Sequence, residues 1–95
     1  MVRLARAELK RAIARGDTDA AEVVRNCPWE TESMTIAELL TSQRRWGRTR
    51  ARKFLMPLAL NENKQLGTLT ERQRRMLANE LANRSMGREA EALAV

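Results

Sequence analysis

The chain has 95 residues, and its 18 lysines and arginines outnumber its 12 acids to give a net charge of +6. This length allows one domain with a modest core, and the charge favours a polyanionic partner, either nucleic acid or an anionic membrane. With no histidine and one cysteine, Cys27, the chain lacks the usual zinc ligands, the usual general base and an internal disulfide. We therefore expect a structural thiol at Cys27, no enzyme activity, no cofactor and no metal.

The longest uninterrupted apolar runs are only a few residues, and no amino-terminal pattern resembles a signal peptide. We therefore expect a cytoplasmic protein without a membrane partner. Apolar residues recur every three or four positions, which is typical of helices and predicts an all-α fold.

A first helix is predicted over residues 2–15, with Gly16 as the residue that ends it. A second helix of about two turns follows. It is capped by one of the polar residues at 17–19, and Pro28 prevents it from continuing. A third helix begins after the polar loop.

Thr35 opens the third helix because it forms a capping box with Glu38, three residues later. Gly47 then supplies the turn to a fourth helix. This helix begins near Arg48, and Pro57 kinks or ends it.

The connection over residues 60–69 is polar but contains three leucines, so we expect it to fold back across the core. Thr70 with Gln73 forms a second capping box, which opens a fifth helix. The apolar pattern weakens beyond that helix's first part. A helical domain over residues 1–83 and a frayed or disordered tail over 84–95 are therefore predicted.

The run "RRWGRTRARK", residues 44–53, holds six basic residues and no acid. Its place between two helices puts the first amides of the fourth helix at the turn, where they favour a phosphate. Arg48 and Arg52 are four residues apart and share one helical face, as Thr49 and Lys53 share the next. The alternative is a solvated helix face, which is what most charge runs are.

The segment "IAELLTSQRRWGRTRARKFLMPLALNENKQLGTLTERQRRML", residues 36–77, resembles the actinobacterial (mycobacterial) integration host factors. That family has a paired leucine, a glycine followed by a basic residue, an alanine three further on, and then a leucine-flanked helix. The matching positions are Leu39, Leu40, Gly47, Arg48, Ala51, Phe54, Leu55, Leu58 and Leu60, with Leu69 and Gln73 closing. Together with the upstream helices, the resemblance covers roughly residues 5–81.

The resemblance implies an all-α, five-helix single domain with a long amino-terminal helix and a helix-two-turns-helix core. It also implies a nucleoid-associated protein that binds and bends duplex DNA with little sequence preference and assists integrase-mediated phage recombination. The expected partner is duplex DNA, with integrase or host nucleoid proteins as further candidates, and the chain is expected to be a monomer. The predicted DNA-binding residues are Arg44, Arg45, Gly47, Arg48, Arg50, Arg52, Lys53, Lys64, Arg72 and Arg75.

The chain departs from the family pattern at two places. The family's Pro-x-Val-Gly-Lys turn reads Arg-Arg-Trp-Gly-Arg here, so Trp46 takes the apolar position and is expected to be buried. The family's paired arginines before Gly-Leu-Gly become Lys64 and Gln65, and a third arginine becomes Gly67. The second DNA-contacting cluster is therefore weaker, as would fit a divergent member, for instance one encoded by a phage.

Two other functions stay open. The same helix-turn motif resembles one used by a ribosomal small-subunit protein, which would make the chain an RNA-binding or ribosome-associated module. The other function is that of a phage protein that interacts with host nucleoid proteins.

Ion pairing with Glu71 is an equal alternative for the arginines at 72–75. Trp29, like Trp46, is expected to fill the core.

Overall fold

A computed structural model describes residues 2–94, with side chains described for residues 3–84. The described residues form five α-helices and three short 3-10 helices, without a β-strand. The α-helices are α1 (Val2–Arg15), α2 (Ala20–Asn26), α3 (Ile36–Thr41), α4 (Arg48–Leu55) and α5 (Glu71–Ala94), and the 3-10 helices are η1 (Trp29–Thr31), η2 (Met56–Leu58) and η3 (Leu66–Thr68). The predicted all-α, five-helix class is confirmed.

Local chemistry fixes most helix ends. Gly16 follows α1 with a φ of +82°, a left-handed conformation that glycine adopts without steric cost. Asp19 caps α2, because its carboxylate accepts a hydrogen bond of 3.2 Å from the Ala21 amide. At the start of α5 the Thr70–Gln73 capping box forms in both directions, with hydrogen bonds of 3.1 and 3.0 Å.

The capping box predicted at α3 is only half formed. The Thr35 hydroxyl accepts from the Glu38 amide at 3.1 Å, as predicted. The Glu38 carboxylate does not return the bond, because it pairs with Arg6 of α1 at 3.0 Å and with Lys10 at 3.4 Å. Two cations outcompete one amide for this carboxylate, so Glu38 joins α1 to α3.

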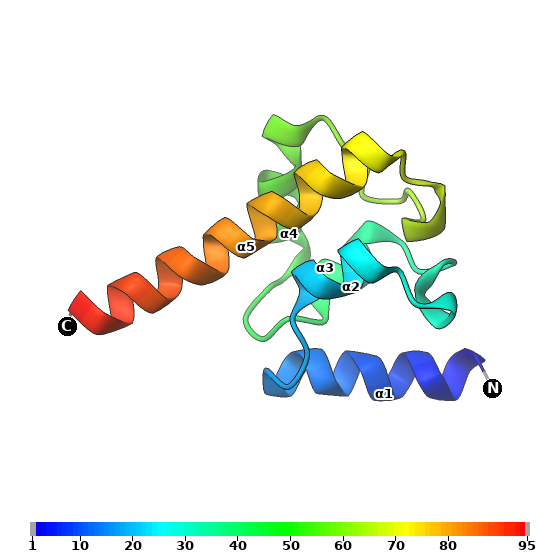
Figure 1. The fold of residues 1–95 in the computed structure, drawn as a ribbon, viewed down its shortest axis with the longest axis horizontal. Helices are drawn as coiled ribbons and strands as arrows, with labels where there is room; N and C mark the ends of the chain where they lie inside the picture. The colour runs from blue at the N-terminus through cyan, green and yellow to red at the C-terminus, as the bar shows by residue number, and fades with distance from the viewer. Residues whose placement is uncertain (1, 95) are drawn as a thin grey trace.

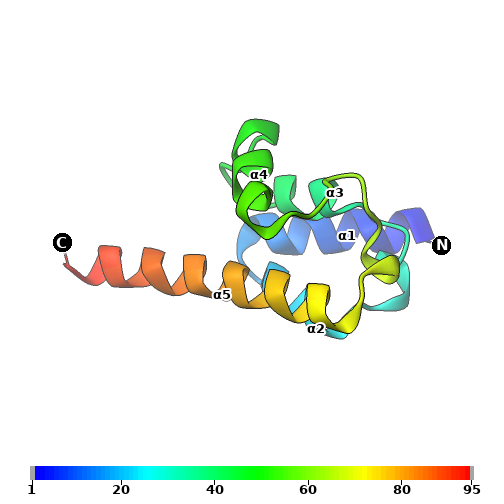
Figure 2. The ribbon, with the colours of Figure 1, turned by 90° about the horizontal axis from the view of Figure 1, so that it is seen from above.

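Figure 1 shows α1 along one side of the domain and α5 along the other, with α2 and α3 between them. Seen from above, α4 lies on one side, and α2 with the first part of α5 lies on the other (Figure 2). The fully or nearly fully buried side chains come from every α-helix. They include Ile13, Val24, Met34, Ile36, Leu39, Leu40, Trp46, Phe54, Leu55 and Leu77.

The connection between η2 and α5 folds across this core, as predicted, since its leucines at 60, 66 and 69 are all buried. Backbone hydrogen bonds hold it against the start of α3. The Leu66 amide donates to the Met34 carbonyl at 2.8 Å, and the Ile36 amide donates to the Lys64 carbonyl at 2.9 Å. The whole connection is thereby ordered beside α3 and α4.

The longest helix is α5, with 24 residues against 14 for α1. Its backbone continues through Gly87 to Ala94 and projects beyond the rest of the domain (Figures 1 and 2). A glycine inside a helix, such as Gly87, lowers the stability of that helix by about 0.5–1 kcal/mol relative to alanine. The frayed tail over residues 84–95 and the domain boundary at 83 remain predictions, and Val95 lies outside the described residues.

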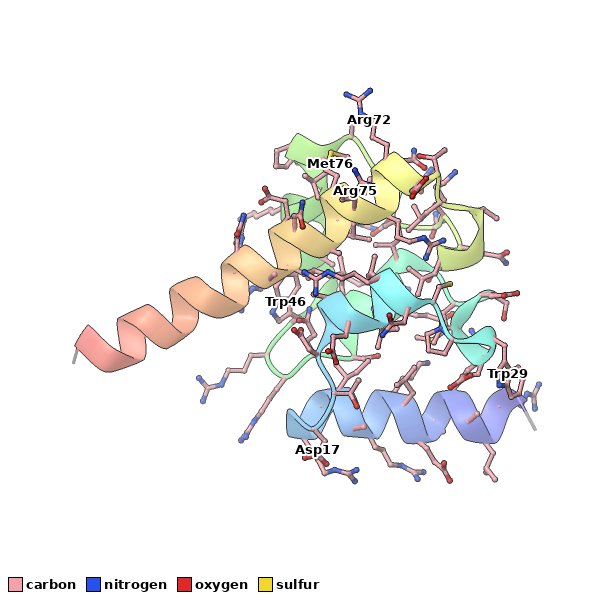
Figure 3. The ribbon with its side chains drawn as sticks, in the orientation of Figure 1. Asp17, Trp29, Trp46, Arg72, Arg75 and Met76 are labelled. Atoms are coloured by element: carbon pink, nitrogen blue, oxygen red, sulfur yellow. The ribbon has the colours of Figure 1, made fainter. Side chains whose placement is uncertain are left out.

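The two tryptophans have different environments (Figure 3). Trp46 is buried at 6% exposure, as predicted, and packs edge-to-face on Phe54 with ring centroids 5.3 Å apart. The prediction that Trp29 fills the core is wrong, because its side chain is 62% exposed. Pro28 starts a 3-10 turn that faces Trp29 outward and buries Thr31, whose hydroxyl donates to the Pro28 carbonyl at 2.7 Å.

Candidate nucleic-acid interface

The turn from α3 to α4 is held by a backbone hydrogen bond and by Trp46. The Trp46 amide donates to the Gln43 carbonyl at 3.2 Å, and the indole anchors the turn in the core. Arg45 has a φ of +70°, a conformation that side-chain-bearing residues adopt at a steric cost of about 1 kcal/mol or more. The turn thus holds exposed arginines at Arg44 and Arg45 on a strained but anchored backbone.

Gly47 is the N-cap residue of α4, and no side chain among the described residues caps this helix end. A helix start without a side-chain cap keeps a partial positive charge and amides that point outward. The residues that follow are basic, so the helix end and the side chains favour an anion together.

Two arginines stack on the aromatic pair beneath this helix start. The Arg50 guanidinium lies 4.4 Å from the centre of the Trp46 ring, and the Arg84 guanidinium lies 5.2 Å from the centre of the Phe54 ring. Stacking of this kind contributes about 0.5–1 kcal/mol at exposed sites. The aromatic pair therefore orients two guanidinium groups.

A groove of about 520 Å³ lies between α4 and α5 at this point. Among the residues whose side chains the structure describes, the lining consists of Gly47, Arg48, Thr49, Arg50, Lys53, Phe54 and Arg84, which include four cations and no acid. Four of the predicted binding residues come together here. The structure therefore collects most of the basic run from Gly47 onward on one surface, whereas Arg44 and Arg45 lie outside the groove lining.

Arg84 is the lining residue that the sequence prediction missed. It lies in α5, just past the predicted domain boundary, and 31 positions along the chain from Lys53. A signal was present, because Arg84 follows Leu77 by seven residues and Leu81 by three. Both leucines are buried, and those spacings place Arg84 on the core-facing side of the helix.

Arg52, predicted to act beside Arg48, lies elsewhere. Its Nε donates to both carboxylate oxygens of Glu62 at 3.1 Å, and it lines a hollow with Met56 rather than the groove. Glu62 reaches it because the connection before α5 runs beside α4. The negative charge of Glu62 therefore offsets the Arg52 charge in this structure.

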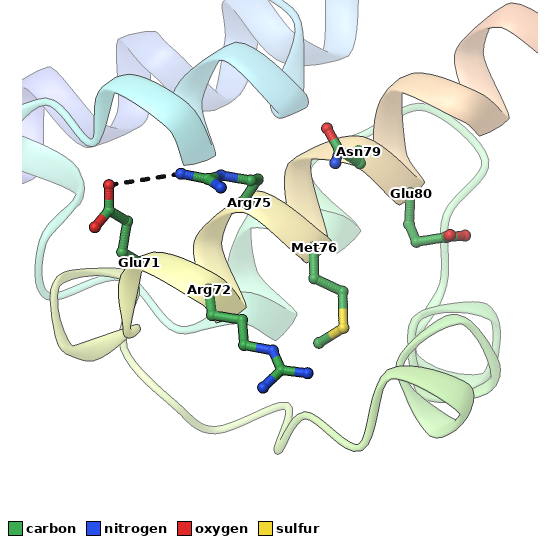
Figure 4. Close-up of a pocket in the computed structure, with 6 residues that line it drawn as sticks. All are labelled: Glu71, Arg72, Arg75, Met76, Asn79 and Glu80. Carbon is green, nitrogen blue, oxygen red and sulfur yellow. Dashed lines mark ion pairs between the residues drawn. The ribbon is translucent and has the colours of Figure 1, made fainter.

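Arg72 and Arg75 lie on the first turns of α5, on different sides of the helix (Figure 4). They line a hollow of about 500 Å³ that also contains Glu71 and Glu80. Arg75 lies 3.7 Å from the Glu71 carboxylate, so the ion pair that was the alternative to DNA binding forms at Arg75. This surface has mixed charge and selects anions less strongly than the groove.

Arg74 points inward and holds backbone groups. Its guanidinium donates to the Val24 carbonyl at 2.9 Å and to the Leu66 carbonyl at 3.0 Å. Lys64, the last predicted binding residue, is half-buried in the connection and outside the groove.

A scan against protein-family models finds no match, and neither does a search of curated proteins. Among solved structures, the chain matches one described as "Structure of sIHF bound to an 8bp palindromic DNA". The TM-score is 0.75 at 24% sequence identity, and the match covers 84% of this chain and 92% of that chain. The described residues thus have an sIHF-like all-α fold. No described helix is long and apolar enough to cross a membrane.

Proposed function

We propose that this chain is a duplex-DNA-binding architectural protein that bends DNA with little sequence preference, like the integration host factors that it resembles. The observation that carries this proposal is the groove in which cations from α4 and α5 meet, with no acid among the described side chains that line it. The fold likeness to sIHF, a protein solved with DNA, supports it.

The chemistry of the groove favours contacts with the DNA backbone. Arginine and lysine side chains neutralise phosphates and release condensed counterions, which supplies affinity without reading base sequence. Preference among sequences would then follow from how easily each duplex bends. We further propose that the protein is a monomer, that it is associated with the nucleoid, and that it acts beside integrase or host nucleoid proteins.

The remaining predicted residues would extend the contact from the groove. Arg44 and Arg45 are exposed on the turn that precedes α4, and Arg72 is exposed on α5. We propose that they bind phosphates further along the duplex, with smaller roles for Lys64 and for the acid-paired Arg52 and Arg75.

Binding to unrelated duplexes of about 25 base pairs, measured by fluorescence anisotropy at several salt concentrations, tests this function. We expect similar affinities for all sequences and a loss of affinity of at least about tenfold between roughly 50 and 200 mM salt. Faster ligase-mediated circularisation of short fragments would report bending. Absence of duplex binding at low salt would contradict the proposal, and stronger binding to RNA in competition would favour an RNA-binding module.

Glu62→Gln is expected to tighten duplex binding by about two- to fivefold, because it removes a negative charge near the backbone and releases Arg52. Anisotropy titration measures the change. Asp17→Asn is the matched control, since Asp17 pairs with Arg15 at 2.9 Å near the end of α1. An equal gain in both variants would mean that only net charge matters, and would contradict a role for Arg52.

A further inference from the structure

The cations of the groove differ from several others on the surface in what faces them. Arg6 and Lys10 face Glu38, Arg52 faces Glu62, and Arg75 faces Glu71. Within the part of the chain whose side chains are described, Arg48, Lys53 and Arg84 form no salt bridge.

Cations gathered around one groove repel each other, and this repulsion opposes folding of the free protein. Arg84 of α5 nevertheless lines the same groove as the cations of α4. Phe54 holds that cation in place, since the Arg84 guanidinium lies over its ring at 5.2 Å. A bound anion would relieve the repulsion between Arg84 and the nearby Arg48 and Lys53, which form no salt bridge among the described side chains.

The geometry points to Arg84 as a phosphate-binding residue, so that α5 is a direct part of the nucleic-acid interface. This inference rests on the proposed function, and it adds Arg84 of α5 to the phosphate-binding residues of α4. The planar guanidinium offers paired N–H donors that match phosphate oxygens. A groove of about 520 Å³ has room for a length of sugar–phosphate backbone, with Arg48 and Lys53 on one side and Arg84 on the other.

The stacking arrangement also assigns a role to Phe54. Its buried ring contacts Trp46 on one side and carries Arg84 on another. An arginine that is already oriented loses less side-chain entropy when it binds a phosphate. Phe54 is therefore a positioning residue for Arg84.

Titration of the full chain with a fixed duplex of about 25 base pairs tests Arg84 directly. Arg84→Gln is expected to weaken binding about three- to tenfold at low salt and to reduce the slope of log Kd against log salt by about one. Arg84→Lys keeps the charge and should restore most of the affinity and the full slope. Both variants should unfold within a few degrees of the wild type, because the side chain is exposed and its stacking on Phe54 contributes only about 0.5–1 kcal/mol.

Arg11→Gln is the matched control, since Arg11 is an exposed arginine of α1, across α2 and α3 from α5 (Figure 1). It should bind with the wild-type slope. If Arg84→Gln also keeps the wild-type affinity and slope while the wild type binds duplex, the inference is wrong and the proposed function stands. If the wild type does not bind duplex at low salt, both fail.

Discussion

Replacing Arg48 and Lys53 together with glutamine is expected to weaken duplex binding by about ten- to a hundredfold at low salt. Both side chains lie in the first two turns of α4 and line the groove. Each phosphate contact contributes a slope of about 0.9 to the dependence of log affinity on log salt. The double variant should therefore have a slope smaller by nearly two, which anisotropy titrations at four or five salt concentrations would resolve.

A charge-matched variant separates the groove from the overall charge of the protein. Arg3 and Arg11 are exposed residues of α1, and their replacement by glutamine also removes two charges. Long-range attraction falls equally in both variants, whereas the loss of direct contacts is confined to the α4 pair. Equal weakening in the two double variants would contradict the assignment of the groove as the binding surface.

The features predicted correctly from the sequence are those set by neighbouring residues. Gly16 and Asp19 determine where α1 ends and α2 begins, and the Thr70–Gln73 box needs only three residues of helical spacing. The burial of Trp46 also followed from its place at an apolar position of the family turn. The signals at Gly16, Asp19 and Thr70 are local and the fold keeps them, whereas at α3 the pairing of Glu38 with Arg6 and Lys10 overrides half of the predicted capping box.

The features that were missed depend on segments distant in the chain. Glu62 offsets Arg52 because the connection before α5 passes beside α4, and Arg84 contacts Phe54 because the fold brings this part of α5 to α4. Trp29 is exposed because Pro28 starts a 3-10 turn, whereas hydrophobicity alone predicts burial. Helical spacing indicates which residues share a face, but not which element that face meets.

The sharpest contrast within one helix is between Arg74 and Arg75. Replacing Arg74 with methionine is expected to lower the free energy of unfolding by about 2–4 kcal/mol, because two buried carbonyls lose a charged donor. One of them, the Val24 carbonyl, lies in the last turn of α2, where a cation also offsets the helix dipole. Replacing Arg75 with methionine should change stability by less than about 0.5 kcal/mol, since its pair with Glu71 is exposed.

Urea denaturation of the two variants measures the difference, and DNA titration under conditions where both are folded gives the complementary result. Arg74→Met should keep the wild-type salt slope, because the Arg74 guanidinium is engaged by the Val24 and Leu66 carbonyls. Arg75→Met should lower the slope if Arg75 binds phosphate. Equal stabilities would contradict the structural role of Arg74. A lowered slope for Arg74→Met would show that this arginine exchanges its carbonyl partners for DNA. Arg74 would then contribute both to the core and to the DNA interface.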